Sequence, residues 1–140
     1  MSLDRIISDI EGLLLNKQYD TAIKAIEPIR ANPGYKAEKQ GYLVDYALGH
    51  AMLMRQKDFT LPEIDKIIEV LVSSLKLNPL FAENHLMLGH AYKHKSDVAD
   101  SEIYAKQSLY YFDNFIKARP ELADMCNSEI KNLKEKFNLK

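Results

Sequence analysis

Cysteine and tryptophan are almost absent from this sequence, which contains one cysteine, Cys126, and no tryptophan. A single cysteine cannot form a disulfide within the chain, and this usage is typical of proteins that fold in a reducing compartment. The chain also has no apolar run near the roughly 20 residues that a membrane-spanning helix needs. Its first residues lack the basic segment and apolar block of a signal peptide. We therefore expect a cytoplasmic protein with no membrane partner.

An excess of positive charge is missing as well. The chain has 19 Lys and Arg against 20 Asp and Glu, so its formal net charge is −1. A protein that neutralises nucleic-acid phosphates needs a basic surface, so nucleic acid is not expected as a partner. The sequence also lacks a GxSxG segment, a glycine-rich phosphate loop, a CxxC pair and an HExxH pattern. We therefore expect no enzymatic activity, no cofactor and no metal ion.

Glycine and proline are few, five of each, and the apolar residues between them repeat with the period of a helix. The 140 residues, 46% hydrophobic and 28% charged, have the size and composition of one globular domain. No segment shows sustained strand alternation, so the sequence predicts an all-α fold. The expected helices cover about residues 3–15, 20–31, 36–56, 60–78, 80–94, 96–118 and 121–138.

Several helix ends carry local signals. Thr60 and Glu63 have the spacing of a capping box, and Pro62 falls in the first helical turn, where its missing N–H matters little. Ser2 is placed to cap the first helix, and Pro28 should kink the second helix or end it early. The clearest amphipathic pattern follows the capping box, at i, i+3, i+4, i+7, i+8 and i+11: Ile64, Ile67, Ile68, Leu71, Val72 and Leu75.

Two short segments of the chain resemble each other. Leu48-Gly49-His50-Ala51 recurs 40 residues later as Leu88-Gly89-His90-Ala91, and two closing prolines, Pro79 and Pro120, lie 41 residues apart. Two independent markers at nearly one offset predict an internal repeat. Glycine within a helix is less favourable than alanine by about 1 kcal/mol, so both glycines are expected where a neighbouring helix comes close.

Further residues occupy corresponding positions of the repeat. They are Met52 and Tyr92 after the Leu-Gly pairs, Tyr19 with Ala22, Ser74-Leu75, Asn78-Pro79 and Arg119-Pro120. Over roughly residues 3–120 this pattern resembles the tetratricopeptide repeat. The chain departs from that family in three ways. Its period is 40 to 41 residues instead of about 34, and its first unit has Asp9-Ile10 in place of Leu-Gly. Its second and third units lack the alanine that usually opens the second helix of the pair. A different αα-repeat with longer units is the alternative.

The resemblance implies a right-handed solenoid of αα-hairpins within a single domain, residues 1–140. Its three helix pairs would cover about residues 3–34, 35–79 and 80–120, and a helix over residues 121–138 would cap the open end of the core. The first helix of each pair would line a concave groove that binds a partner protein or peptide. The groove residues implied in this way are Tyr46, His50, Leu53, Leu86, His90 and Lys93.

The character of this lining indicates what it would bind. Family members that hold a C-terminal carboxylate use Lys with Asn or Arg at such places, and only Lys93 fits that scheme. An apolar or helical segment of a partner therefore suits the groove better. In the alternative interpretation, Tyr46, Leu53 and Leu86 belong to the core or lie under the last helix.

Three other features of the sequence are candidate sites. His90 and His94 have a spacing that can bind a metal ion, but no third ligand accompanies them, so partner contacts or surface positions are favoured. Cys126 lies on an apolar stripe, which favours core packing over a nucleophile. The cluster of Tyr104, Tyr110 and Tyr111 is either an interface or core, and the last two point about 100° apart on a helix.

The sequence thus predicts a non-catalytic protein–protein interaction module of adaptor, chaperone-like or immunity type. The alternative is a structural protein whose helix faces pair with copies of themselves, for example in a homodimer.

Overall fold

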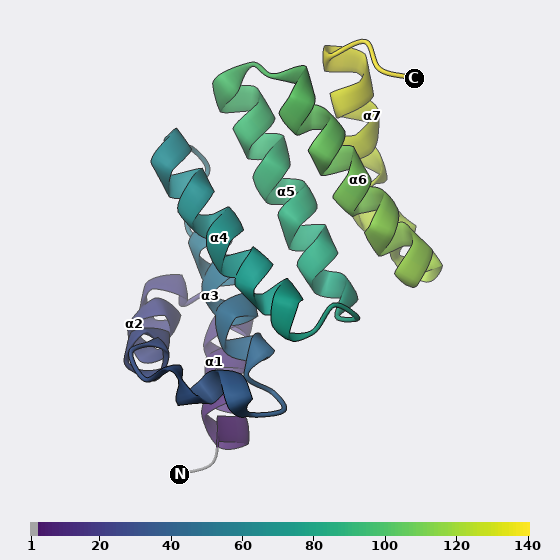
Figure 1. Cartoon of the computed structure of the whole chain (residues 1–140). Helices are drawn as coiled ribbons and strands as arrows, with labels where there is room; N and C mark the ends of the chain where they lie inside the picture. Colours follow the sequence, from purple (N-terminus) through teal and green to yellow (C-terminus); the bar gives the residue numbers. More distant parts are fainter. Residues whose placement is uncertain (1–2) are drawn as a thin grey trace. The chain divides into compact units, whose positions relative to one another are not determined.

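The computed structural model describes residues 3–140, which form helices, turns and irregular segments without a strand. The all-α prediction is therefore confirmed for this part of the chain, whereas the expected cap, Ser2, lies outside it. Figure 1 shows the elements in sequence order. They are α1 (Leu3–Leu15), α2 (Tyr19–Arg30), η1 (Pro33–Ala37), α3 (Tyr42–Met54), α4 (Leu61–Leu77), α5 (Ala82–Ala99), α6 (Glu102–Ala118), η2 (Pro120–Met125) and α7 (Asn127–Lys136), where η marks a 3-10 helix.

The capping box before α4 is confirmed. The Thr60 N–H donates to Glu63 Oε1 at 2.9 Å, and the Glu63 N–H donates to Thr60 Oγ1 at 3.4 Å. Two backbone donors at the helix start are satisfied in this way, as the sequence spacing predicts. Within α4, the predicted stripe is buried at Ile64, Ile67, Ile68 and Leu71 and partly buried at Val72 and Leu75.

The predicted start of the third helix at residue 36 is wrong, because α3 begins only at Tyr42. Residues 33–37 form η1 instead, and Glu38 after it is extended, with a ψ of 146°. The side chain of Tyr35 is buried, and the turn after it brings Gly41 against the Tyr35 carbonyl so closely that a Cβ at Gly41 would overlap it. This tertiary anchoring of Tyr35 overrides the helical pattern of the local sequence.

The border between the fifth and sixth helices is also misplaced in the prediction. Ser96, expected to start a helix, lies inside α5 and donates to the Lys93 carbonyl at 2.7 Å. The helix ends at Ala99 because Asp100 adopts a left-handed conformation with a φ of 48°. Asp is one of the few non-glycine residues that tolerates this conformation, and α6 follows from Glu102.

Two further predictions on helix ends need correction. Of the two outcomes predicted for Pro28, a kink or an early end, the early end is wrong, since α2 continues through Pro28 to Arg30. The last segment is not one helix over residues 121–138. A 3-10 helix, η2, precedes α7, and Cys126 between them has a φ of −135°, which is not helical.

Contacts divide the chain into two compact units whose border falls within α4. The first unit runs up to Asp58 and includes Glu69–Leu80, and the second comprises Phe59–Ile68 and Phe81–Lys140. Helix α4 therefore contributes its beginning to the second unit and its end to the first. The single domain over residues 1–140, with helix pairs at 3–34, 35–79 and 80–120, stays a prediction.

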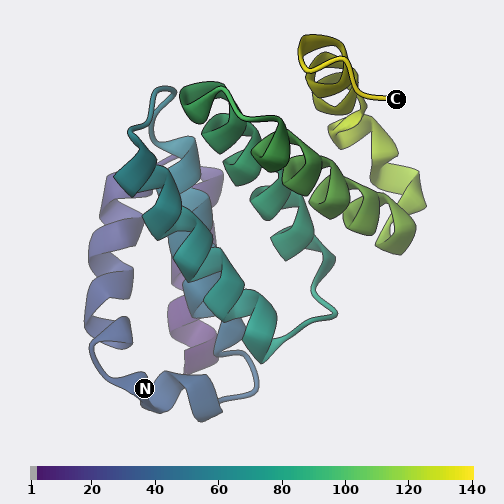
Figure 2. The same cartoon turned by 45° about the horizontal axis from the view of Figure 1, so that its top comes forward.

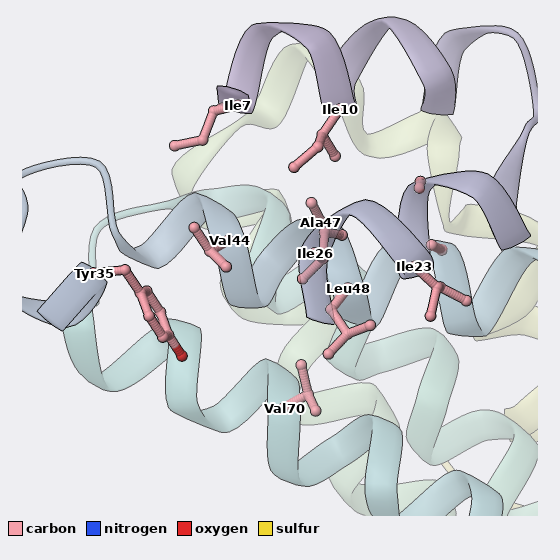
Figure 3. Packing of buried hydrophobic residues seen from close by; sticks show 11 residues of the cluster. Ile7, Ile10, Ile23, Ile26, Tyr35, Val44, Ala47, Leu48 and Val70 are labelled. Atoms are coloured by element: carbon pink, nitrogen blue, oxygen red, sulfur yellow. The ribbon is translucent and has the colours of Figure 1, made fainter. Parts of the chain in front are cut away.

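The core of the first unit is built by α1, α2 and α3, with additions from η1 and α4 (Figure 3). Apolar residues on these helices recur at three- and four-residue intervals, which places them on one face of each helix. Burial of this face is the main stabilising contribution. The cluster consists of Ile7, Ile10, Ala22, Ile23, Ile26, Tyr35, Val44, Ala47, Leu48, Ala51 and Val70.

A buried carboxylate lies beside this core. Asp45 has an exposed fraction of 0%, and its Oδ1 accepts hydrogen bonds from Tyr35 Oη at 2.7 Å and Arg30 Nε at 2.8 Å. Its Oδ2 accepts one from Ser73 Oγ at 2.6 Å. A buried charge is tolerated only when it is paired and hydrogen-bonded, and this set of donors meets both conditions.

In the second unit, α5 and α6 pack side by side as a hairpin, and α7 packs against α6 (Figure 2). The predicted close approach at the glycines is confirmed in both units. A Cβ at Gly89 would lie 2.5 Å from the buried ring of Phe112, and one at Gly49 would overlap the side chain of Leu71. Ser108 Oγ also donates to the Gly89 carbonyl at 2.6 Å, so α5 and α6 are joined by a hydrogen bond at this point.

Candidate functional site

The first set of predicted site residues lies on one face of α3. Tyr46, His50 and Leu53 are spaced at i, i+4 and i+7, and the rings of Tyr46 and His50 meet edge to face at 5.8 Å. Tyr46 and His50 are partly accessible, whereas Leu53 is only 5% exposed. The α3 face can therefore offer a phenol and an imidazole to a ligand, while Leu53 matches the alternative interpretation as core.

The second set of predicted site residues lies on α5, where Leu86, His90 and Lys93 have the same i, i+4 and i+7 spacing. His90 packs edge to face against Phe112 at 5.2 Å, and Lys93 lies one turn further along the helix. Both are partly accessible, but Leu86 is only 3% exposed and belongs to the core. Glu129 on α7 is near enough to act electrostatically on His90, so the last helix borders this face.

Burial lowers the pKa of both imidazoles below the usual value of 6.5. For His50, desolvation is the cause. For His90, desolvation is the largest cause, Glu129 acts in the opposite direction, and Lys93 and His94 lower the pKa further. Each ring is therefore neutral at pH 7, and a neutral imidazole has one N–H donor and one nitrogen acceptor. Chemically, these faces can form hydrogen bonds and apolar contacts with a partner.

These pKa shifts predict a loss of stability in mild acid. A histidine whose pKa is lower in the folded state stabilises the fold fully above its unfolded pKa of about 6.5, and this contribution is lost as the pH falls below that value. The melting temperature of the chain should therefore fall between pH 7.5 and 5.5, a range above the titration of ordinary carboxylates. The double variant His50→Gln/His90→Gln should show a flatter profile, and an equally steep profile would contradict the assignment.

His90 and His94 are the two side chains whose sequence spacing could suit a metal ion. Their rings pack against different partners, since His94 lies 4.8 Å from the ring of Phe59 while His90 contacts Phe112. No group of three or more His, Cys, Asp or Glu side chains that could hold a metal ion occurs among residues 3–140. Cys126 is buried, and burial raises the pKa of its thiol, which disfavours the reactive thiolate.

The tyrosines form a stacked array that sequence reasoning detected only in part. Tyr92 stacks on Tyr111 at 5.6 Å and on Tyr104 at 6.4 Å, and Lys95 Nζ lies 4.2 Å from the Tyr104 ring centre. Tyr110 is 61% exposed, whereas Tyr111 is partly buried, as their different directions on the helix predict. The spacing of Tyr104 and Tyr111, seven residues on one helix face, is the signal that could have indicated the array.

The described helices include none that is both long enough and apolar enough to cross a membrane. Comparison of the sequence with models of known protein families, and with curated proteins, finds no match. The resemblance to the tetratricopeptide repeat therefore rests on the Leu-Gly pairs, the closing prolines and their spacing.

Proposed function

We propose that this protein is a non-catalytic interaction module that binds a partner polypeptide, in the cytoplasm, through the accessible positions of α3 and α5. In this proposal the helix pairs form a tetratricopeptide-like right-handed solenoid, and the partner lies in its concave groove. A role of adaptor, chaperone-like or immunity type fits this proposal. Neither nucleic acid nor membrane is part of the proposal, since the chain has no excess of positive charge.

The observation that supports the proposal is the accessibility of four of the six implied groove residues. Tyr46 and His50 on α3, and His90 and Lys93 on α5, are all partly exposed. Aromatic side chains that combine an apolar ring with a polar atom are enriched in protein interfaces. Their rings are already held against neighbours, so little side-chain entropy is lost when a partner binds.

Affinity capture with matched variants tests this proposal. Partner proteins retained by the immobilised chain should be lost with Tyr46→Ala/His90→Ala, whereas Lys24→Ala/Lys106→Ala, which changes two exposed lysines, should retain them. The single variants then show whether the α3 face or the α5 face contributes more. Equal retention by all variants, with unchanged melting temperatures, would place the interface elsewhere.

The second candidate is self-association, which one feature of α6 favours. Ile103 and Tyr110 lie seven residues apart on the same helix face and are 69% and 61% exposed. Pairing of this face with that of a second copy would bury both side chains. Sedimentation at two concentrations distinguishes the candidates, because a tight dimer that persists on dilution and is broken by Ile103→Lys would favour the second.

A further inference from the structure

The first unit contains an open cleft of about 560 Å³ that none of the predicted site residues lines. Its charged lining consists of Arg30, Lys36, Lys76 and Glu69, and Val72 and Leu77 supply apolar contacts. Val72, Lys76 and Glu69 recur on one face of the end of α4, while Arg30 and Lys36 come from α2 and η1. Positively charged and apolar side chains therefore line the same concave site.

Arg30 is held in this cleft by the buried carboxylate behind it. Asp45 accepts from Arg30 Nε at 2.8 Å, and Ser73, which also lines the cleft, donates to the other oxygen of Asp45. A guanidinium has five N–H donors in a rigid plane, and the bond to Asp45 uses one of them. The Arg30 side chain is 26% exposed, so its remaining edge is within reach of a ligand.

The charged side chains of the cleft indicate which kind of ligand it suits. Lys36 and Lys76 form no ion pair within residues 3–140. The three cations, together with the carboxylates of Glu69 and Asp45, give the cleft a formal excess of one positive charge. A single carboxylate matches this excess, and a doubly charged phosphate would leave negative charge uncompensated beside Glu69.

We infer that this cleft binds a Glu or Asp side chain of an acidic peptide segment whose neighbouring residue is apolar. Arg30 forms charge-assisted hydrogen bonds with the carboxylate, Lys36 and Lys76 add attraction, and Val72 and Leu77 contact the apolar neighbour. The inference rests on the proposed function, because it assigns a chemistry to part of the partner polypeptide.

Titration of the whole chain by amide NMR tests the inference. The probe is the peptide Ac-Leu-Glu-Leu-NH2, and Ac-Leu-Gln-Leu-NH2 and inorganic phosphate are titrated separately. The Glu peptide should shift the amide signals of Lys36, Ser73, Lys76 and Leu77. The variant Lys36→Gln/Lys76→Gln should weaken its binding at least fivefold, and Lys24→Gln/Lys57→Gln, which removes the same charge elsewhere in the first unit, should leave it unchanged.

Three results would overturn the inference: equal binding of the Gln peptide, tighter binding of phosphate, or shifts confined to other residues. Its failure is distinguishable from that of the proposed function. If Tyr46→Ala/His90→Ala loses captured partners while the Glu peptide does not bind the cleft, the interaction module stands and only the acidic segment is excluded.

Discussion

Replacement of Gly89 with leucine is expected to lower the free energy of unfolding by about 3 kcal/mol, at the upper end of typical overpacking effects. A Cβ at this position would already lie 2.5 Å from the ring of Phe112, which is fully buried. In a chain of this size, such a loss corresponds to a fall in melting temperature of about 10 °C. Urea unfolding of the variant measures the free energy directly.

A matched control is Gly12→Ala. Gly12 also lies inside a helix, α1, but a Cβ there would meet no atom within 4 Å. Alanine should therefore stabilise the chain by up to about 1 kcal/mol through helix propensity alone. Gly89→Ala should destabilise in spite of the same gain in propensity. Stabilisation by both alanine variants would show that α5 and α6 do not need glycine at their contact.

The second large effect is expected at Asp45. Asp45→Ala should lower the free energy of unfolding by about 2–3 kcal/mol, because it leaves the donors of Arg30, Tyr35 and Ser73 without their shared acceptor. The value is below that for a fully buried ion pair, since Arg30 is 26% exposed and water can solvate it in part. Thermal and urea unfolding measure the change.

A double-mutant cycle separates the charge from the packing. In an Arg30→Met background no cation is left unpaired, so Asp45→Ala should cost less than it does in the parent chain. Asp9→Ala, at an exposed position of α1, should change the free energy of unfolding by less than about 0.5 kcal/mol. Equal costs of Asp45→Ala in both backgrounds would show that Arg30 contributes nothing to the stability of the pair.

The surroundings of Asp45 raise the pKa values of both Tyr35 and Arg30. For Tyr35, desolvation is the largest cause, and the hydrogen bond to Asp45 adds to it. For Arg30, desolvation acts in the opposite direction, but hydrogen bonds with Tyr35 and Asp45 and the charge of Asp45 outweigh it. The tyrosine thus stays protonated as a donor and the guanidinium stays charged, which keeps Arg30 available for the proposed ligand.

Helices were predictable wherever their signals are local. The capping box at Thr60 and Glu63 and the apolar stripe of α4 depend on neighbours within a few positions. The close approaches at Gly49 and Gly89 involve distant residues, but the repeated Leu-Gly segment indicated them. The helix starts at Tyr42 and Glu102 were not predictable, because they depend on the burial of Tyr35 and on the left-handed conformation of Asp100. The helix propensity of the local sequence does not indicate either feature.

The sequence by itself determined that this chain is helical and where its apolar faces lie, because these properties follow from residue spacing along a helix. It also indicated which glycines permit close contact, because glycine is unfavourable within a helix and recurs in the repeated segment. Only the tertiary structure decided which polar residues meet. Asp45 receives its donors from positions 10, 15 and 28 residues away, and the cleft collects its cations from α2, η1 and α4. Such encounters arise when packing brings distant turns of helix together, and no periodicity in the sequence encodes them.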